Sequence, residues 1–251
     1  MLFDSNHIKF MIFTLCFTTI SLLIFYKTIK NQKSKDLVLK IFSILTVIIH
    51  YSGLWVDYFS TGTAIADQTL LLPVYPCHIA MWLILIVAFM KNKNSKIFTI
   101  LSEFTFYLGL VGGVIGIMFN ENYAANPNML DWDIFKGLLT HVTLLVSCIY
   151  LLVGKYIKIR VFNTISCIFG MTGLLVDGAI VILLHKIFGL DAPNAMFLLE
   201  NPFPQVAWIN TWFVGFIAVL LVFITTSIFE FITFNKEDRW YKNLNLQGDK
   251  K

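Results

Sequence analysis

Seven long apolar runs decide what this chain can fold into, and the segments between them are alternately rich in lysine and free of it. Hydrophobic residues make up 57% of the sequence and charged residues only 14%, which is far from the composition of a soluble domain. A helix needs about 20 apolar residues to cross about 30 Å of hydrocarbon. We therefore predict one all-α domain over residues 1–251, a polytopic membrane bundle of seven transmembrane helices. The runs cover residues 10–27, 38–56, 70–90, 97–119, 135–153, 161–186 and 207–234.

The basic residues indicate how these helices are oriented. Cytoplasmic loops retain lysine and arginine, whereas translocated loops do not. Of the 19 basic residues, all but Lys9, Lys136 and Lys186 lie after the first, third, fifth and seventh runs or at their edges. This pattern predicts an outside N-terminus, a cytoplasmic C-terminus and a short basic cytoplasmic tail over residues 235–251. The net charge of +4 is explained by the basic residues of the cytoplasmic loops, so we expect no nucleic-acid partner. We expect the protein to lie in the cell membrane.

Several ionisable side chains are expected at one depth near the outer surface. With the predicted orientation, one outer slice of the bundle contains His50, Cys77, His78, His141 and His185. His141 lies about 12 Å below the outer end of its helix, and only His7, in the N-terminal tail, has no obvious place in the slice. Ionisable groups inside a membrane mark a functional site by default. A histidine can also hydrogen-bond across helices for packing, and this alternative stays open for His50 and His185.

Cys77 has a specific case as a nucleophile. If Pro76 takes the first helical position, the thiol lies in the first turn, where free N–H groups and the helix dipole favour a thiolate. A helix from Pro76 to Met90 would be about 22 Å long, too short to span, so residues 70–75 are expected to be kinked or unwound beside a cavity. Adjacent helical positions point about 100° apart, which gives His78 a packing or interfacial role.

Glycines and carboxylates complete the set of unusual residues in the runs. Small residues that let membrane helices approach closely share one face of the fourth run; they are Gly109, Gly112, Gly113 and Gly116. Asp177, near the middle of the sixth run, can orient a histidine as the third member of a nucleophile, base and carboxylate arrangement. Glu103 and Glu230 lie near predicted cytoplasmic ends, where we expect solvated or snorkelling carboxylates.

Two segments carry a resemblance to a known family. Residues 72–77, of sequence LPVYPC, resemble the LPLHLC signature of the YwaF-type integral membrane proteins, with Tyr75 where that family usually has histidine. Residues 194–202 resemble its NYMFLxxKP segment, and the glycine-rich run followed by His141 has the family's order. The resemblance covers roughly residues 40 to 235. Departures from the family's pattern occur at Ala195, Asn201 and the pair Asn120 and Glu121.

The resemblance implies an activity on lipids. A eukaryotic branch of similar architecture is associated with phospholipid acyl transfer, which makes Cys77 the nucleophile and His141 the general base. We therefore predict a lipid acyltransferase or lipid hydrolase near the outer leaflet, with membrane lipids as partners and no cofactor. The predicted catalytic residues are Cys77, His141, His50 and Asp177, and the predicted substrate-binding residues are Tyr75 and Asn194.

Two other functions stay open at this point. The proline-broken third run can form the substrate site of a transporter or lipid-binding protein. An intramembrane zinc hydrolase can use His50 and His141 with one further ligand and an open position for water. That ligand is one of His78, His185, Asp177 and Cys77. No local spacing of ligands supports a metal, and none is predicted.

Overall fold

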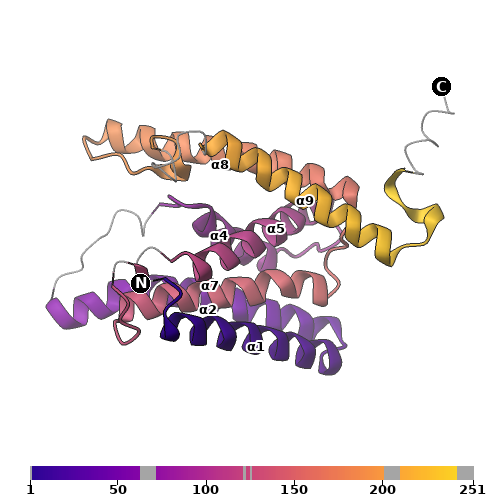
Figure 1. Ribbon diagram of the computed structural model, residues 1–251, viewed down its shortest axis with the longest axis horizontal. Coiled ribbons are helices and arrows are strands. Elements are labelled where there is room, and N and C mark those ends of the chain that lie inside the picture. Colours follow the sequence, from indigo (N-terminus) through magenta and orange to yellow (C-terminus); the bar gives the residue numbers. More distant parts are fainter. Residues whose placement is uncertain (1, 63–71, 121–122, 125, 201–209, 242–251) are drawn as a thin grey trace. The chain divides into compact units, whose positions relative to one another are not determined.

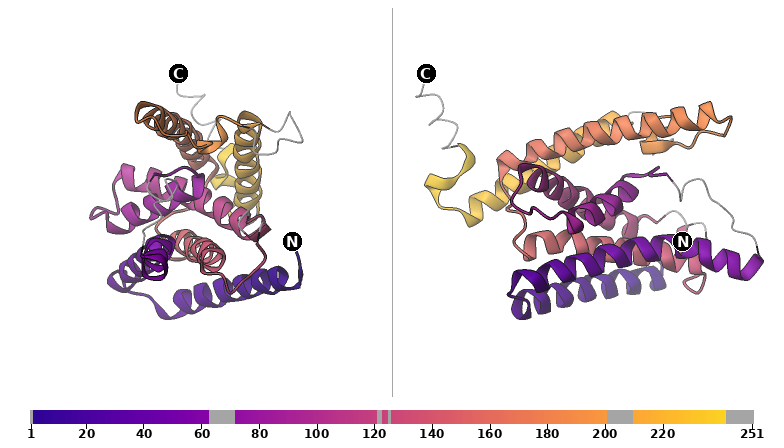
Figure 2. Two further views of the ribbon diagram at one scale, coloured as in Figure 1. Left: turned by 90° about the vertical axis from the view of Figure 1, so that its left-hand side faces the viewer. Right: turned by 180° about the vertical axis from the view of Figure 1, so that it is seen from behind.

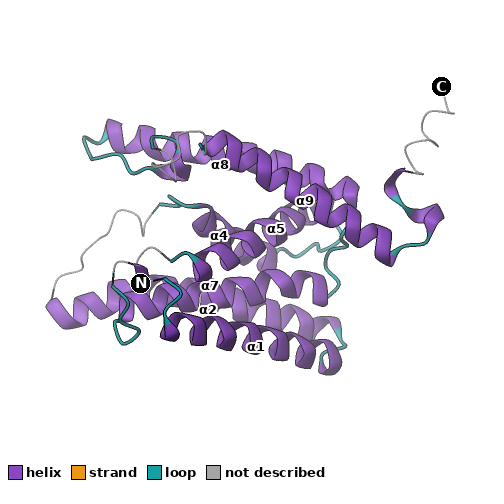
Figure 3. Ribbon diagram, viewed as in Figure 1, coloured by secondary structure: helices purple, strands orange, loops and turns teal. Residues whose placement is uncertain are grey.

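The computed structural model describes residues 2–62, 72–120, 123, 124, 126–200 and 210–241. These residues form helices and connecting loops, with no β-strand among them (Figure 3). The all-helical prediction is therefore confirmed. The chain forms two compact units, residues 1–156 and residues 157–251. The prediction of a single domain stays a prediction.

The described part of the first unit is a bundle built around one central helix (Figure 1, Figure 2). Its helices are α1 (Ser5–Thr28), α2 (Gln32–Thr61), α4 (Pro76–Phe89), α5 (Lys96–Met118) and α7 (Trp132–Val153). The central helix is α7, because it contacts α1, α2, α4 and α5, while α4 also contacts α2 and α5. Accordingly α5 and α7 carry the most buried residues of this unit.

Polar caps and one proline set where these helices begin. The side chains of Asp4, Asn31 and Ser95 each accept a backbone N–H in the first turn of α1, α2 and α5. These caps start α1 and α2 earlier than residues 10 and 38, because the apolar runs exclude the polar first turns. By contrast α4 has Pro76 at its start after an extended Tyr75, as the sequence predicts.

Six described helices are long and apolar enough to cross a membrane. The third run is not among them, since its helix α4 has only 14 residues. The prediction of a helical protein that crosses the membrane several times is thus confirmed. The seventh span and the orientation of the termini stay predictions. Parts of the predicted runs and tail lie outside the described residues, namely 70, 71, 207–209 and 242–251.

The N-terminal turn of α1 is tied to the end of α5. Since His7 Nδ1 accepts the backbone N–H of Phe3 at 3.0 Å, the imidazole proton lies on Nε2, which donates to the Ile117 carbonyl at 2.7 Å. That carbonyl belongs to the last turn of α5, where intrahelical donors are missing. Tyr123 packs on the His7 ring at 4.7 Å and donates to Asp4 Oδ1 at 2.7 Å. His7 is therefore a buried structural residue and not part of a loose tail.

The contact between Asp4 and Tyr123 makes stability depend on pH. The backbone N–H of His7 and then the Tyr123 hydroxyl lower the pKa of Asp4 below 3.8, while burial and then Asp4 raise the pKa of Tyr123 to about 12. The contribution of Asp4 is present above its unfolded pKa and is lost as pH falls through the folded value. Below about pH 4 we expect the melting temperature of the wild type to fall faster than that of Asp4→Asn. Parallel melting curves over that range would contradict this linkage.

The described part of the second unit consists of two long helices and three short ones. They are α8 (Thr164–Ile187) and α9 (Thr211–Thr233), with the 3-10 helices η1 (Val161–Asn163), η2 (Ala195–Phe197) and η3 (Lys236–Asp238). Both α9 and η2 contact α8, and η1 contacts both long helices. Helix α8 begins at Thr164, later than the predicted residue 161, because η1 occupies the first three positions.

An ion pair between Arg160 and the buried carboxylate of Glu230 joins the segment before η1 to the end of α9. Arg160 Nη1 lies 3.0 Å from Glu230 Oε1 and also donates to the Asp238 carbonyl at 2.9 Å. The Glu230 side chain is only 1% exposed, and Glu103 on α5 is 4% exposed as a residue. The expectation that both carboxylates are solvated is therefore wrong. The two carboxylates lie near helix ends and are nevertheless buried. Neighbouring helices cover Glu103, and Arg160 covers Glu230.

Candidate functional site

The first turn of α4 holds Cys77 against the backbone of α5. Pro76 occupies the first helical position, so the thiol lies where the dipole of α4 is positive. A Cβ atom placed on Gly112 would lie 3.7 Å from both Cα and Cβ of Cys77. This is an ordinary van der Waals distance, which shows that Cys77 packs directly on the Gly112 turn.

One turn further along α5, a second glycine receives the imidazole of His141. A Cβ atom on Gly116 would overlap the His141 ring at Cε1, Nδ1 and Nε2, so only glycine leaves room for this ring position. Gly112 and Gly116 are four residues apart, which places them about 6 Å apart along the same helix face. The α5 backbone thus brings Cys77 from α4 and His141 from α7 to adjacent turns of one surface.

The His141 ring keeps one nitrogen without a protein partner. Its Nδ1 atom is buried and has no hydrogen-bond partner within the described ranges of the chain. Buried polar atoms normally have such a partner. A ring nitrogen in this state can accept a proton from a thiol or a substrate hydroxyl, which is what a general base requires.

His50 and His78 form a second pair beside this surface. Their ring centroids are 4.9 Å apart with planes at 57°, and the Tyr75 ring lies 5.5 Å from His78. His78 thus reaches α2 while Cys77 packs on α5, in agreement with the predicted divergence of adjacent side chains. His141 interacts electrostatically with both His50 and His78. The pair fits helix packing as well as proton transfer, so the catalytic role of His50 and the substrate-binding role of Tyr75 stay predictions.

Lys136 is a residue of this region that sequence reasoning missed. Its side chain is only 13% exposed, its ammonium pairs with Asp133 Oδ1 at 2.6 Å, and the same group packs over Gly53 of α2. Lys136 also interacts electrostatically with His50. The available signal was a lysine near the start of the run that contains His141, on the side of the membrane predicted to carry only three basic residues.

Two predicted site residues belong to the second unit. Asp177 lies on α8, and its Oδ2 atom is buried with no hydrogen-bond partner in the part of the chain that the structure describes. The amide of Asn194 closes its own loop, because Oδ1 accepts from the N–H groups of Leu199 and Glu200 and Nδ2 donates to the Glu200 carbonyl. Their roles beside His141 and in substrate binding stay predictions.

The geometry gives no support to the zinc alternative. Among residues 2–62, 72–120, 123, 124, 126–200 and 210–241, no three His, Cys, Asp or Glu side chains come close enough to hold a metal ion. The chemical character of the region comes instead from a thiol and an imidazole on one glycine-lined surface, with a second imidazole pair and a lysine nearby.

Comparison with known proteins identifies a family for this chain. The sequence model described as the TMEM164 family matches residues 2–228, which include all of the elements that place Cys77 and His141. No curated protein matches the chain, and no solved structure does. The YwaF-type resemblance stays a prediction. Because the match extends over nearly the whole sequence, this chain belongs to the TMEM164 family.

Proposed function

We propose that this protein transfers acyl groups between membrane lipids through a thioester on Cys77. The observation that carries the proposal is the placement of Cys77 and His141 against adjacent turns of α5, at Gly112 and Gly116. A thiol needs a neighbouring base to become a nucleophile at neutral pH. The unpartnered Nδ1 of His141 suits that base.

Cys77 and His141 divide the reaction into two steps, and in each step His141 takes up one proton and returns it. His141 takes the Cys77 proton, the sulfur attacks the ester carbonyl of a donor lipid, and the ester C–O bond breaks as His141 returns the proton to the leaving alcohol. A hydroxyl or amine of a second lipid then gives its proton to His141 and attacks the thioester. The C–S bond breaks, and the proton returns to Cys77. Water in place of the second lipid gives hydrolysis.

Surrounding groups support this chemistry by their charge. The positive end of the α4 dipole favours both the thiolate and the oxyanion of the tetrahedral intermediate. The ammonium of Lys136, which is paired with Asp133, can also contact a lipid phosphate. We place His50 in the proton-transfer group through its electrostatic interaction with His141.

A second candidate is a lipid-binding protein or transporter without turnover. One observation favours it: α4 is a short helix of 14 residues that begins at a proline-containing segment, as in broken helices that line membrane transport sites. In that case lipid would bind at the same surface, and Cys77 would not become acylated.

Acyl capture tests the proposal directly. Purified full-length protein in liposomes receives a phospholipid with an alkyne-tagged acyl chain, and the protein is assayed for a hydroxylamine-sensitive label. We expect Cys77→Ala to abolish the label and His141→Ala to slow its formation at least about 100-fold. The matched control is Cys148→Ala, because Cys148 is a free, buried thiol that packs on Gly109, two turns from the His141 contact.

Three outcomes separate the candidates. Label on wild type and Cys148→Ala but not on Cys77→Ala supports acyl transfer. Label of equal intensity on Cys77→Ala contradicts it, because another residue would then be the acceptor. Lipid binding or flux without any label favours the second candidate.

A further inference from the structure

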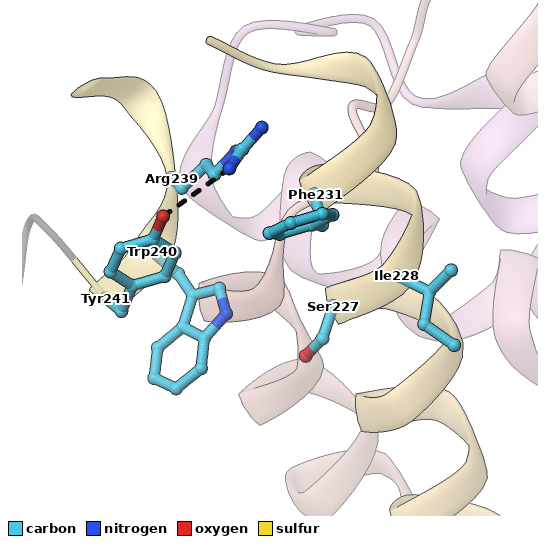
Figure 4. A pocket seen from close by; sticks show the side chains of 6 residues that line it. All are labelled: Ser227, Ile228, Phe231, Arg239, Trp240 and Tyr241. Atoms are coloured by element: carbon cyan, nitrogen blue, oxygen red, sulfur yellow. Dashed lines mark hydrogen bonds between the residues drawn. The ribbon is translucent and has the colours of Figure 1, made fainter. Parts of the chain in front are cut away.

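The chain beyond α9 turns back and covers one face of that helix (Figure 4). Trp240 packs on Phe223 at 5.8 Å, and the Arg239 guanidinium lies 4.1 Å from the centre of the Phe231 ring. These two contacts are eight residues apart on α9, and Ser227 lies midway between them. The space that remains is a pocket of 360 Å³, lined by Ser227, Ile228, Phe231, Arg239, Trp240 and Tyr241.

Ser227 places an unsatisfied polar atom on the wall of this pocket. Its Oγ is buried and has no hydrogen-bond partner within the described chain. A serine inside a helix usually donates to the carbonyl four residues earlier, as Thr225 does here to Leu221. A buried hydroxyl without a partner is unfavourable by about 1–3 kcal/mol. A ligand that brings an acceptor into the pocket removes this penalty.

Arg239 brings a positive charge that the protein does not neutralise. Its Nε donates to the Phe234 carbonyl at 3.2 Å, and Nη1 lies 3.5 Å from the Tyr241 hydroxyl, which is at the limit of a hydrogen bond. No carboxylate pairs with Arg239 in the described part of the second unit. Most N–H donors of the Arg239 guanidinium therefore have no partner within the described residues, and a planar fork of free donors suits a phosphate.

We propose that this pocket binds one anionic phospholipid. Helix α9 is long and apolar enough to span a membrane, so its end at Thr233 lies near a membrane surface. Ile228 and Phe231 are 54% and 60% exposed there and provide an apolar track for an acyl chain. The phosphate lies on Arg239, the Ser227 hydroxyl bonds the glycerol ester region, and Trp240 occupies the depth that interfacial aromatic residues prefer. The site uses no residue of the Cys77 and His141 surface and stands independently of the proposed acyl transfer.

Native mass spectrometry of the purified full-length protein tests this site. The probes are phosphatidylglycerol, phosphatidylcholine and inorganic phosphate, each titrated into the protein in the same detergent. We expect Arg239→Gln to weaken phosphatidylglycerol binding about tenfold, through loss of a charge-assisted hydrogen bond. We expect Ser227→Leu to weaken it by a similar factor, because the leucine side chain fills the pocket while Arg239 is retained.

Lys236→Gln is the matched control. Lys236 is exposed, carries the same charge and lies three residues before Arg239 without lining the pocket. The dissociation constant of the Lys236→Gln variant for phosphatidylglycerol should stay within about twofold of the wild-type value. Phosphatidylcholine should bind weakly to every variant, and inorganic phosphate should not displace phosphatidylglycerol.

Any of four results would overturn the proposal. They are unchanged binding in Arg239→Gln, unchanged binding in Ser227→Leu, an equal loss in Lys236→Gln, and displacement by inorganic phosphate. If Arg239→Gln does not fold, Ser227→Leu decides the question, because it changes the pocket wall and leaves Arg239 and Trp240 in the sequence. Melting temperatures in detergent identify folded variants before binding is compared.

Discussion

Replacing Gly116 with alanine is expected to reduce acyl labelling of Cys77 about 100-fold while the protein remains folded in the membrane. The added methyl group would occupy the position of the His141 ring, so the imidazole must rotate away. A displacement of about 1 Å at a catalytic base lowers the rate by this order of magnitude. The initial rate of label formation in liposomes measures the effect, and Gly116→Ala combined with His141→Ala should be no worse than His141→Ala alone.

Gly112→Ala is the matched control for this experiment. The two glycines are one turn apart on α5, yet a methyl group on Gly112 would meet Cys77 only at ordinary contact distances of 3.7 Å and above. We expect its labelling rate within about threefold of wild type. An equal loss in both variants would show that the glycine face serves helix packing alone, and the role of Gly116 in seating His141 would be wrong.

Replacing Arg160 with methionine is expected to destabilise the folded protein by about 3–5 kcal/mol. The change leaves the Glu230 carboxylate without its partner at a position that is 1% exposed. It also removes the hydrogen bond from Arg160 to the Asp238 carbonyl, which is one of the contacts that hold η3 near the end of α9. Thermal unfolding in detergent should show a melting temperature lower by about 10 °C.

The double variant Arg160→Met with Glu230→Gln separates charge from packing. Glutamine has nearly the shape of glutamate and no charge, so the uncompensated charge is removed along with the arginine. We expect the double variant to recover more than half of the lost stability. A double variant as unstable as Arg160→Met would show that the cation–π contact with Phe234, at 3.8 Å, dominates the arginine's contribution.

The sequence predicts the helices better than their burial. Hydropathy locates each helix to within about six residues at either end, because membrane crossing needs a fixed length of apolar chain. Pro76 predicts the start of α4 because a proline is tolerated only where an N–H is not needed. Hydropathy does not predict that Glu230 is buried, since this depends on Arg160, which lies 70 positions away in the chain.

The same limit applies to the candidate site. Cys77 and His141 are recognisable as unusual residues in apolar runs, and a periodic glycine face on α5 predicts close approach of other helices. Which glycine receives which side chain depends on the rotation of α4 and α7 about their axes, and no local pattern encodes this rotation. Lys136 and His7 were missed for the same reason, because each acquires its role through contacts with residues more than 80 positions away.

The shortness of α4 bears on how a lipid would reach Cys77 in the proposed acyl transfer. Its 14 residues extend about 21 Å, which is about 9 Å less than the hydrocarbon thickness. Bilayers respond to such hydrophobic mismatch by thinning locally. In the proposed acyl transfer, such thinning would lower the ester groups of lipids beside the first turn of α4 toward Cys77.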